Sequence, residues 1–471
     1  MNQDEFRKHA HRVADWIADY YAGIEQRAVK AAVRPGDVAA QLPAAAPEKG
    51  EPAEAIFADF ERVVMPGITH WQHPNFYAYF PGNSSAPAIL AEMLASGLAV
   101  NCMLWQTSPA GTEMETRVLE WLRDAMGLPQ QWHGSIQTTA SEATLAALLA
   151  ARERALGWRG NRAGLSGGPR FTVYCSEETH TSIDKAVAVA GLGLDNLRKI
   201  ATNERFAMRA DALEQSITSD LEAGAQPLAV VATLGTTGVG GIDPLRKIGE
   251  VCRRHGLWLH ADAAWAGSAL LLPEQRAMID GAEYADSFVF NPHKWMLTNF
   301  DCSVLYVSDR KTLTRTFEVL PEYLKTPEDS QVINYRDWGI PLGRRFRALK
   351  LWFVLRSYGL EGIRAKMREQ IECTARIAAM MRAAENFEIT SVPVLTLFSF
   401  RHRPAGMNDG AELDAWNARL LAALNGSGKA YFTQTRSRGR YIIRWCIGSP
   451  QTEWRHVEET WALIQHTTLN L

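Results

Sequence analysis

Two charged side chains stand in apolar surroundings, and both could take part in catalysis. Lys294 follows the strand-like residues 288–290 and the Asn291-Pro292 pair, at which helix and strand pairing both stop. A lysine that loses water has a lowered pKa and becomes an amine nucleophile able to form a Schiff base. Asp262 lies in the apolar run 257–264, where a carboxylate needs a cation nearby. Taken singly, such a lysine is more often a snorkelling surface residue, and such an aspartate is more often paired with an arginine.

A third feature would supply an anion site. Residues 138–142 precede an apolar-periodic helix, and Thr139 with Glu142 three positions later fits a capping box. The free N–H groups and hydroxyls of a helix start are a natural seat for phosphate. Pyridoxal phosphate requires this whole set: a lysine for its aldehyde, an acid for its pyridine nitrogen and an anion site. His180, on a loop after the predicted strand 171–175, would stack on the flat ring.

The alternation of strands and helices predicts how these residues are positioned. From about residue 134 to 307 it indicates an α/β fold, with a mainly parallel sheet and helices on both faces. Ligands of such sheets bind at the carboxyl ends of the strands, where the three features would meet. Amphipathic helices expected at 3–24 and 53–64 must dock on the body or on a second subunit. We predict three parts: residues 1–80 as an N-terminal helical arm and dimerisation segment, 81–345 as the large cofactor-binding domain, and 346–471 as a small C-terminal α+β domain.

The composition is that of an ordinary globular protein. The chain has 471 residues, 46% hydrophobic and 22% charged, and its formal charge of -2 gives no reason to expect nucleic acid or an anionic membrane as partner. Six cysteines without a CxxC pair favour reduced thiols and a cytoplasmic location. The charged N-terminus does not fit a signal peptide, and no run is typical of a membrane span. We expect no metal site.

Four segments together carry a family signature. They are Asn291-Pro292-His293-Lys294-Trp295, His260-Ala261-Asp262-Ala263-Ala264, Ala140-Ser141-Glu142-Ala143-Thr144-Leu145 and Ile340-Pro341-Leu342-Gly343-Arg344-Arg345-Phe346-Arg347. These segments resemble the group II pyridoxal-phosphate decarboxylases, and within them the aromatic-L-amino-acid decarboxylases of the DOPA and tryptophan decarboxylase type. The likeness extends nearly from end to end. It implies fold type I, a pyridoxal 5'-phosphate cofactor, and a homodimer with its active site at the interface.

The resemblance also implies roles for single residues. Lys294 would bond to the cofactor's aldehyde and Asp262 would pair with its ring nitrogen. His180 would stack on the ring, with Ala264 against the other face. Phosphate-binding positions are matched by Thr139, Ala140, Ser141, Ser287 and Asn291. Positions close to the ring are matched by Thr236, His260 and His293.

The substrate side is expected to be aromatic. Five aromatic residues between positions 71 and 80 form either a loop packed over the core or a rigid wall for a flat side chain. The resemblance favours the wall, which suits a large flat side chain and so disfavours glutamate or histidine as the substrate. The substrate-binding residues it implies are Trp71, Tyr79, Phe80, Pro81, Met103, His180 and Gly343.

Tyr323 distinguishes the reactions that this family performs. It matches the loop tyrosine that the family uses to protonate the substrate carbon after carbon dioxide leaves. Related aldehyde synthases commonly carry phenylalanine there, and other oxidative relatives replace the stacking histidine with asparagine. With Tyr323 and His180 present, we predict decarboxylation of an L-aromatic amino acid to its amine. The candidate substrates are DOPA, 5-hydroxytryptophan, tryptophan, tyrosine and phenylalanine.

Two alternatives and one open question accompany this prediction. The first alternative is an aromatic acetaldehyde synthase on the same fold, which would also oxidise the amine carbon. The second is a non-catalytic interaction protein on this scaffold. The preferred substrate stays open because residues 101–104 depart from the animal relatives, which usually have Phe-Ser where this chain has Met103-Leu104.

Overall fold

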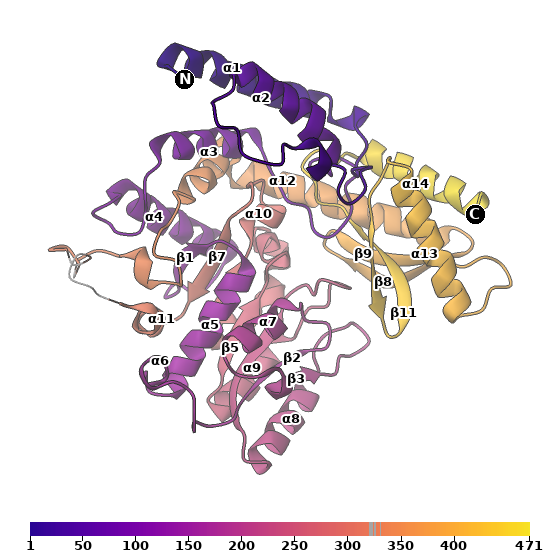
Figure 1. Cartoon of the computed structure of the whole chain (residues 1–471). Helices are drawn as coiled ribbons and strands as arrows, with labels where there is room; N and C mark the ends of the chain where they lie inside the picture. Colours follow the sequence, from indigo (N-terminus) through magenta and orange to yellow (C-terminus); the bar gives the residue numbers. More distant parts are fainter. Residues whose placement is uncertain (320–323, 325, 330) are drawn as a thin grey trace.

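A seven-stranded sheet forms the centre of the chain in this computed structural model, and a four-stranded sheet lies beside it (Figure 1). The structure describes residues 1–319, 324, 326–329 and 331–471. The strand order of the large sheet is β1-β7-β6-β5-β4-β2-β3. Its strands are β1 (His133–Gln137), β2 (Phe171–Ser176), β3 (Leu197–Ile200), β4 (Gln226–Thr233), β5 (Trp258–Asp262), β6 (Ser287–Phe290) and β7 (Ser303–Val307).

The large sheet is mainly parallel, as the sequence predicts. Strands β6, β5, β4, β2 and β3 pair in parallel, whereas β7 is antiparallel to both β6 and β1. The carboxyl ends of the parallel strands therefore lie along one edge, where ligands of open α/β sheets bind. The family expectation of an α/β fold with helices around this sheet is confirmed.

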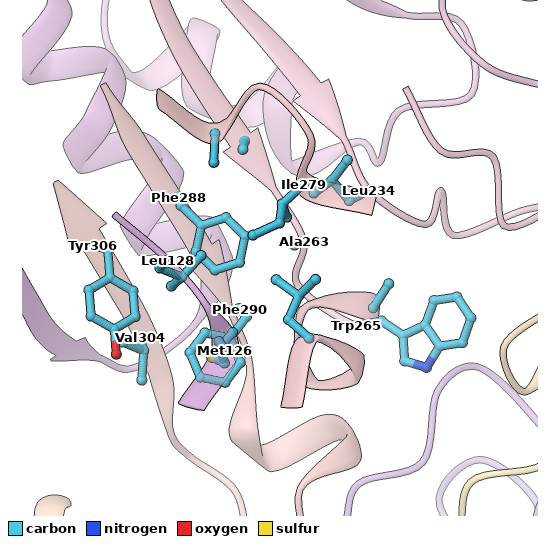
Figure 2. Packing of buried hydrophobic residues seen from close by; sticks show 14 of the residues in the cluster. Met126, Leu128, Leu234, Ala263, Trp265, Ile279, Phe288, Phe290, Val304 and Tyr306 are labelled. Carbon is cyan, nitrogen blue, oxygen red and sulfur yellow. The ribbon is translucent and has the colours of Figure 1, made fainter. Parts of the chain in front are cut away.

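Helices cover both faces of the large sheet because the strand residues that point to either face are apolar. Val230 packs in a core with α4 (Pro109–Met126), α8 (Ala210–Glu222) and α9 (Leu245–His255). Ala229 and Val231 pack in the opposite core with α5 (Ala140–Ala155) and α7 (Ser182–Val189). Figure 2 shows the first core, in which Phe288 and Phe290 of β6 lie beside Tyr306 and Val304 of β7.

The N-terminal arm contains the two expected helices, with shorter bounds for the second. They are α1 (Gln3–Ala22) and α2 (Ala53–Asp59), and the latter continues as one wider turn to Val64. The arm lies along one side of the molecule, over α12 (Ala348–Ala383) and next to α3 (Ala86–Leu98) (Figure 1). The short helices α6 (Gly160–Ala163) and α10 (Pro292–Trp295) lie between strands of the large sheet, and α11 (Arg310–Phe317) follows its last strand, β7. None of the helices in the described part of the chain has the length and apolar character needed to cross a membrane.

The C-terminal part has the predicted α+β composition. Its antiparallel sheet has the order β10-β11-β9-β8 and is covered by α12, α13 (Ala411–Gly426) and α14 (Trp454–Leu469). Its strands are β8 (Phe387–Val394), β9 (Leu397–His402), β10 (Thr433–Ser437) and β11 (Arg440–Cys446). Strands β8 and β9 form a hairpin, and the chain turns between them at Leu395, whose φ is 53°. The domain boundaries after residues 80 and 345 stay predictions.

Candidate active site

Loops at the carboxyl edge of the large sheet enclose a recess of about 260 Å³. Lys294 lies in α10 directly after β6, and Asp262 is the last residue of the neighbouring β5. His180 follows β2, and Thr139 lies between β1 and α5. The structure thus brings together predicted site residues that are far apart in sequence. Those that line the recess are Thr139, Ala140, Ser141, His180, Asp262, Ala264, Asn291, His293 and Lys294.

Lys294 has the electrostatic environment of a nucleophilic amine. Burial lowers the pKa of its ammonium below the ordinary value, while the nearby Asp262 carboxylate opposes that shift. Its Nζ lies 5.1 Å from the centre of the Phe80 ring, which stabilises the residual positive charge. A larger fraction of Lys294 is therefore the neutral, reactive amine than for a lysine in water.

Asp262 is a buried carboxylate, only 5% exposed. One oxygen, Oδ1, accepts a hydrogen bond of 3.0 Å from the backbone N–H of Ala264. No ion pair joins it to a lysine or arginine among the residues that the structure describes. The arginine partner expected of a purely structural aspartate is therefore not found within that part of the chain. Its carboxylate is suited to a protonated ring nitrogen in the recess.

His180 is oriented by the start of α7. Its Nδ1 accepts a hydrogen bond of 3.1 Å from the backbone N–H of Ser182, so the neutral ring carries its proton on Nε2. Burial is the main cause of the lowered pKa of His180, and the positive charge of Lys294 lowers it further. A neutral, fixed imidazole suits a ring that stacks on a flat ligand better than a charged and solvated one would.

The N-terminus of α5 could hold an anion. The Thr139 hydroxyl caps the helix by accepting from the N–H of Glu142 at 3.4 Å. The predicted capping box is shifted by one residue, because Glu142 Oε2 accepts from the N–H of Thr138 at 2.9 Å and not from Thr139. The N–H groups of Ala140 and Ser141 belong to the first turn, which has no carbonyl partner within the helix. These N–H groups give the helix start a partial positive charge, and this end of the helix faces the recess.

His293 and Asn291 complete the edge of the recess around Lys294. The pKa of His293 is lowered to about 3, mainly by burial and further by the positive charge of Lys294. This histidine is therefore neutral. Its Nδ1 accepts from the N–H of Cys302 at 2.9 Å. The Asn291 Oδ1 accepts from the hydroxyl of Ser303 at 2.7 Å, and its backbone N–H donates to Ala264. Both side chains are fixed by β7 and the residue before it.

A wider cleft of about 1130 Å³ opens from the recess. Five predicted substrate residues line it: Trp71, Tyr79, Phe80, Pro81 and His180. The Trp71 and Tyr79 rings stack at 5.7 Å, and Phe80 stacks on Trp265 at 4.6 Å. Trp71, Tyr79 and Phe80 thus border the cleft as a wall, whereas Phe76 and Tyr77 are fully buried in the core, so each of the two interpretations holds for part of this segment. Six residues border both hollows: Phe80, His180, Thr237, His293, Lys294 and Phe300.

Three predicted ring or phosphate residues lie outside both hollows. Thr236 is fully buried and its Oγ1 accepts from the N–H of Gly241, so the next residue, Thr237, borders the recess instead. His260 is enclosed in the core between Ser287 Oγ at 2.8 Å and Thr144 Oγ1 at 3.1 Å, and burial lowers its pKa to about 4. Ser287 begins β6, at the end of the strand away from Lys294, and its hydroxyl also accepts from Trp258.

Two predicted substrate residues lie in another part of the chain. The Met103 carbonyl accepts from the N–H of Arg336, and Gly343 lies beside Asn101, but neither residue lines the recess or the cleft. A pocket formed by this chain alone therefore does not contain them. Tyr323 lies outside the described residues.

Several lining residues were not predicted from the sequence. Phe300 and Thr237 border both hollows, and Trp265 lies behind Phe80. Arg444 lines the cleft, and burial lowers the pKa of its guanidinium. It donates to Tyr79 O and Gly238 O, both at 3.2 Å, and to Thr433 Oγ1 at 2.9 Å. Arg444 thus ties the aromatic wall to β10 and to the loop after β4, a link that no local sequence signal indicates.

The groups in the recess fit a phosphorylated pyridine aldehyde. They include an amine with a lowered pKa, a buried carboxylate and a capped helix start, with His180 and Ala264 also on the lining. A family model described as the pyridoxal-dependent decarboxylase conserved domain matches residues 35–403. The chain belongs to the pyridoxal-dependent decarboxylases. Pyridoxal phosphate is the cofactor of this decarboxylase family.

Several known proteins align with this pyridoxal-dependent decarboxylase over almost its whole length. A phenylacetaldehyde synthase of Arabidopsis thaliana is 41% identical, over 99% of this chain and 96% of the relative. An aromatic-L-amino-acid decarboxylase of Bos taurus is also 41% identical, over 99% of this chain and 96% of the relative. The crystal structure of Oryza sativa TDC with PLP and tryptamine superposes with a TM-score of 0.97 at 36% identity, covering 100% of this chain and 99% of that one.

Proposed function

We propose that this pyridoxal-dependent decarboxylase converts an aromatic L-amino acid to its amine and carbon dioxide. The observation that carries the proposal is the continuity of the two hollows: the aromatic wall of the cleft leads directly to Lys294. A flat side chain would pack against Trp71, Tyr79 and Phe80, while its amino and carboxyl groups reach the recess. Relatives that are about 40% identical include a tyrosine decarboxylase of Narcissus pseudonarcissus and a tryptophan decarboxylase of Oryza sativa, which support the same substrate class.

The recess residues would hold the cofactor by complementary charge. The Lys294 amine would bond to the aldehyde carbon, and Asp262 would keep the ring nitrogen protonated. His180 and Ala264 would lie against opposite faces of the ring. The phosphate would lie at the start of α5 and beside α10, held by Thr139, Ala140, Ser141 and Asn291. When bound, the cofactor accepts the electron pair that remains on the substrate carbon as carbon dioxide leaves.

The chain's own residues would then control orientation, water and protons. The wall residues hold the aromatic ring, and this fixes the direction of the carboxylate bond at the substrate carbon. His180 and His293 are neutral at pH 7, so neither adds a positive charge that would stabilise the carboxylate before it leaves. We assign the return of a proton to the substrate carbon to the Tyr323 hydroxyl, on the basis of the family resemblance.

The test is amine formation from the five aromatic amino acids named above. We expect carbon dioxide and the matching amine in equal amounts, with no activity toward glutamate. A protein that keeps its cofactor yet forms no amine from any of the five would contradict the proposal. The same measurement separates the enzyme from a non-catalytic protein on this scaffold, which would leave all five substrates unchanged.

An aromatic acetaldehyde synthase is the second candidate, favoured by the 41% identity to the Arabidopsis thaliana relative of that name. Oxidation of the amine carbon by dioxygen, with water as the second co-reactant, would release hydrogen peroxide and ammonia in proportion to carbon dioxide, and an aldehyde in place of the amine. We expect peroxide to stay far below the amine, because Tyr323 and His180 are both present. Peroxide in amounts equal to carbon dioxide would replace our proposal with this one.

We also propose a homodimer with its active site at the subunit interface. The face of α3 exposes four large apolar residues, and an apolar groove of about 630 Å³ lies between α3 and α1. These residues are Leu90, Met93, Leu94 and Leu98, each at least 41% exposed. A second copy would cover them, since such a patch is rarely left in water. In such a dimer Met103 and Gly343, which lie away from the chain's own cleft, would serve the partner's substrate.

Light scattering tests the dimer. The wild type should have twice the mass of the chain, and Leu94→Lys should lower the mass to that of a monomer. Leu221→Lys is the matched control, because Leu221 is 47% exposed on α8, at the far end of the molecule from α3 (Figure 1). A monomeric wild type would contradict the proposal.

A further inference from the structure

Strand β1 lies at the edge of the large sheet and leads directly into the start of α5. Within the described residues it pairs with β7 on one side only, where Ile136 is opposite Val304. An edge strand has backbone N–H and C=O groups that need other partners. A single residue, Thr138, separates β1 from Thr139, the N-cap of α5. The position of this helix start therefore depends on what holds the free edge of β1.

A buried ion pair occupies that free edge. Glu115 of α4 accepts a hydrogen bond of 2.8 Å from the backbone N–H of Ile136. Arg344 donates to the backbone carbonyl of Ile136 at 2.8 Å, and to the two carboxylate oxygens of Glu115 at 2.7 and 3.1 Å. The exposed fraction is 8% for the Arg344 side chain and 2% for that of Glu115. The pair thus bonds to both backbone groups of Ile136, as a neighbouring strand would.

The guanidinium of Arg344 is held by further contacts. Its central carbon lies 4.6 Å from the centre of the Tyr335 ring, and the Tyr335 hydroxyl lies 3.0 Å from Thr116 Oγ1 on α4. The backbone carbonyl of Arg344 accepts from the N–H of Cys102 at 2.9 Å. A two-bond contact between a guanidinium and a carboxylate restricts direction as well as distance. Arg344 therefore holds β1 in one position relative to α4.

The packing of α5 on the sheet restrains the helix only weakly along its axis. Its buried face consists mostly of alanine, namely Ala143, Ala146, Ala147, Ala150 and Ala151. Helix packing depends on side chains that interlock, and such short side chains form shallow ridges. The connection to β1 supplies the restraint that this smooth face lacks. A fixed β1 thus means a fixed helix start.

We infer that Glu115 and Arg344 are positioning residues for the phosphate of the cofactor. Neither lines the recess, so they act through β1 on Thr139, Ala140 and Ser141. This inference rests on the proposed function, which places the phosphate at the start of α5. A displaced helix start would weaken the hydrogen bonds to the phosphate. The rest of the recess would be unchanged, because its residues follow other strands.

The test compares the affinity of the full-length protein for pyridoxal 5'-phosphate and for pyridoxal, which lacks the phosphate. Arg344→Lys keeps the positive charge but loses the planar group that bonds to Ile136 and to both Glu115 oxygens at once. We expect the dissociation constant for pyridoxal 5'-phosphate, measured by visible absorption, to rise about tenfold. The dissociation constant for pyridoxal should stay within about twofold of that of the wild type.

A second variant and a matched control separate the effect on the phosphate from a loss of stability. Glu115→Gln combined with Arg344→Met leaves no unpaired buried charge, and it should weaken pyridoxal 5'-phosphate binding at least as much. Arg401→Lys is the control, because Arg401 is fully buried in β9 and pairs with Asp414 at 2.8 Å, away from the recess. It should lower the midpoint of denaturant unfolding and leave both dissociation constants unchanged.

Three results would overturn the inference. The first is an unchanged dissociation constant for pyridoxal 5'-phosphate in both variants. The second is equal weakening for pyridoxal 5'-phosphate and pyridoxal, which would assign the pair to the stability of the whole recess. The third is the same phosphate-specific loss in Arg401→Lys.

Failure of this inference can be told apart from failure of the proposed function. A wild type that binds pyridoxal as tightly as pyridoxal 5'-phosphate would contradict the phosphate site of the proposed function. A wild type that prefers pyridoxal 5'-phosphate, with the same preference in both variants, would contradict only the role of Glu115 and Arg344.

Discussion

The recess around Lys294 and the cleft outside it are built in different ways. The recess is made of polar residues that follow the ends of β1, β2, β5 and β6, and four of them are fixed by hydrogen bonds to the backbone or to β7: Asp262, His180, His293 and Asn291. The aromatic wall of the cleft comes mainly from one segment, residues 71–80, which is held by ring stacking and by Arg444. In the proposed function, polar groups at strand ends determine the reaction, whereas packed rings determine which side chain enters. Substitutions in the two regions should therefore change different kinetic constants.

The largest effect should come from the amine of the recess. Lys294→Ala should lower amine formation at least about 10³-fold, because no other described side chain in the recess supplies a neutral amine. The visible absorption of the bound cofactor should disappear or shift. Lys311→Ala, on the exposed face of α11, is the control and should keep both properties. Normal turnover by Lys294→Ala would contradict the division between recess and cleft.

The next effect should come from the carboxylate at the end of β5. Asp262→Asn should lower kcat about 10²-fold to 10³-fold, because an amide cannot keep the ring nitrogen of the cofactor protonated. KM should change much less, since Asp262 does not line the cleft. Asp262→Glu keeps the charge and should retain more activity than the amide. If the two variants were equally impaired, geometry and not charge would explain the loss.

The sequence predicts the residues of the recess better than those of the cleft, because the signals for the recess lie within short stretches of the sequence. Lys294 and Asp262 are recognisable because each is a charge inside an apolar run, and the carboxyl-edge rule for parallel sheets then brings them together. The prediction named Thr236, whereas its neighbour Thr237 borders the recess. The hydrogen bond from the Gly241 N–H to Thr236 Oγ1 decides which of these two threonines faces the recess. No composition or periodicity indicates that bond.

Longer-range contacts set the rest. The seven-stranded sheet follows from alternating strands and helices, but the β8–β9 hairpin was missed because Leu395, and not glycine, adopts the positive φ at its turn. Phe300 was missed because its exposure depends on Asp301 pairing with Arg347, 46 residues later. Ser287 was assigned to the phosphate by the family resemblance alone, and it begins β6, at the end of the strand away from Lys294.

Acid stability should reveal the buried histidine beneath the recess. Burial lowers the pKa of His260 from 6.5 to about 4, so the folded chain excludes a proton that the unfolded chain binds. The free energy of unfolding should therefore fall as the pH drops from about 6.5 to about 4, by about 1.4 kcal/mol per pH unit for this residue. Denaturant unfolding at several pH values in this window measures the slope.

Two matched variants test whether this pH dependence of the free energy of unfolding comes from His260. His260→Gln removes the titration and should reduce the slope by about one proton, while the exposed His466→Gln should leave it unchanged. His293, whose pKa is lowered to about 3, should maintain part of the slope in both variants. An unchanged slope in His260→Gln would show that its ring is already charged in the folded protein.

The smallest effect should come from the outer wall of the cleft. Trp71 is 42% exposed and stacks on Tyr79, so Trp71→Leu removes one face of the wall without opening the core. We expect KM for aromatic substrates to rise about threefold with kcat unchanged, because the lost contact acts equally on the bound substrate and its transition state. A fall in kcat with constant KM would mean that the wall takes part in the reaction, and the separation between the two regions would then be wrong.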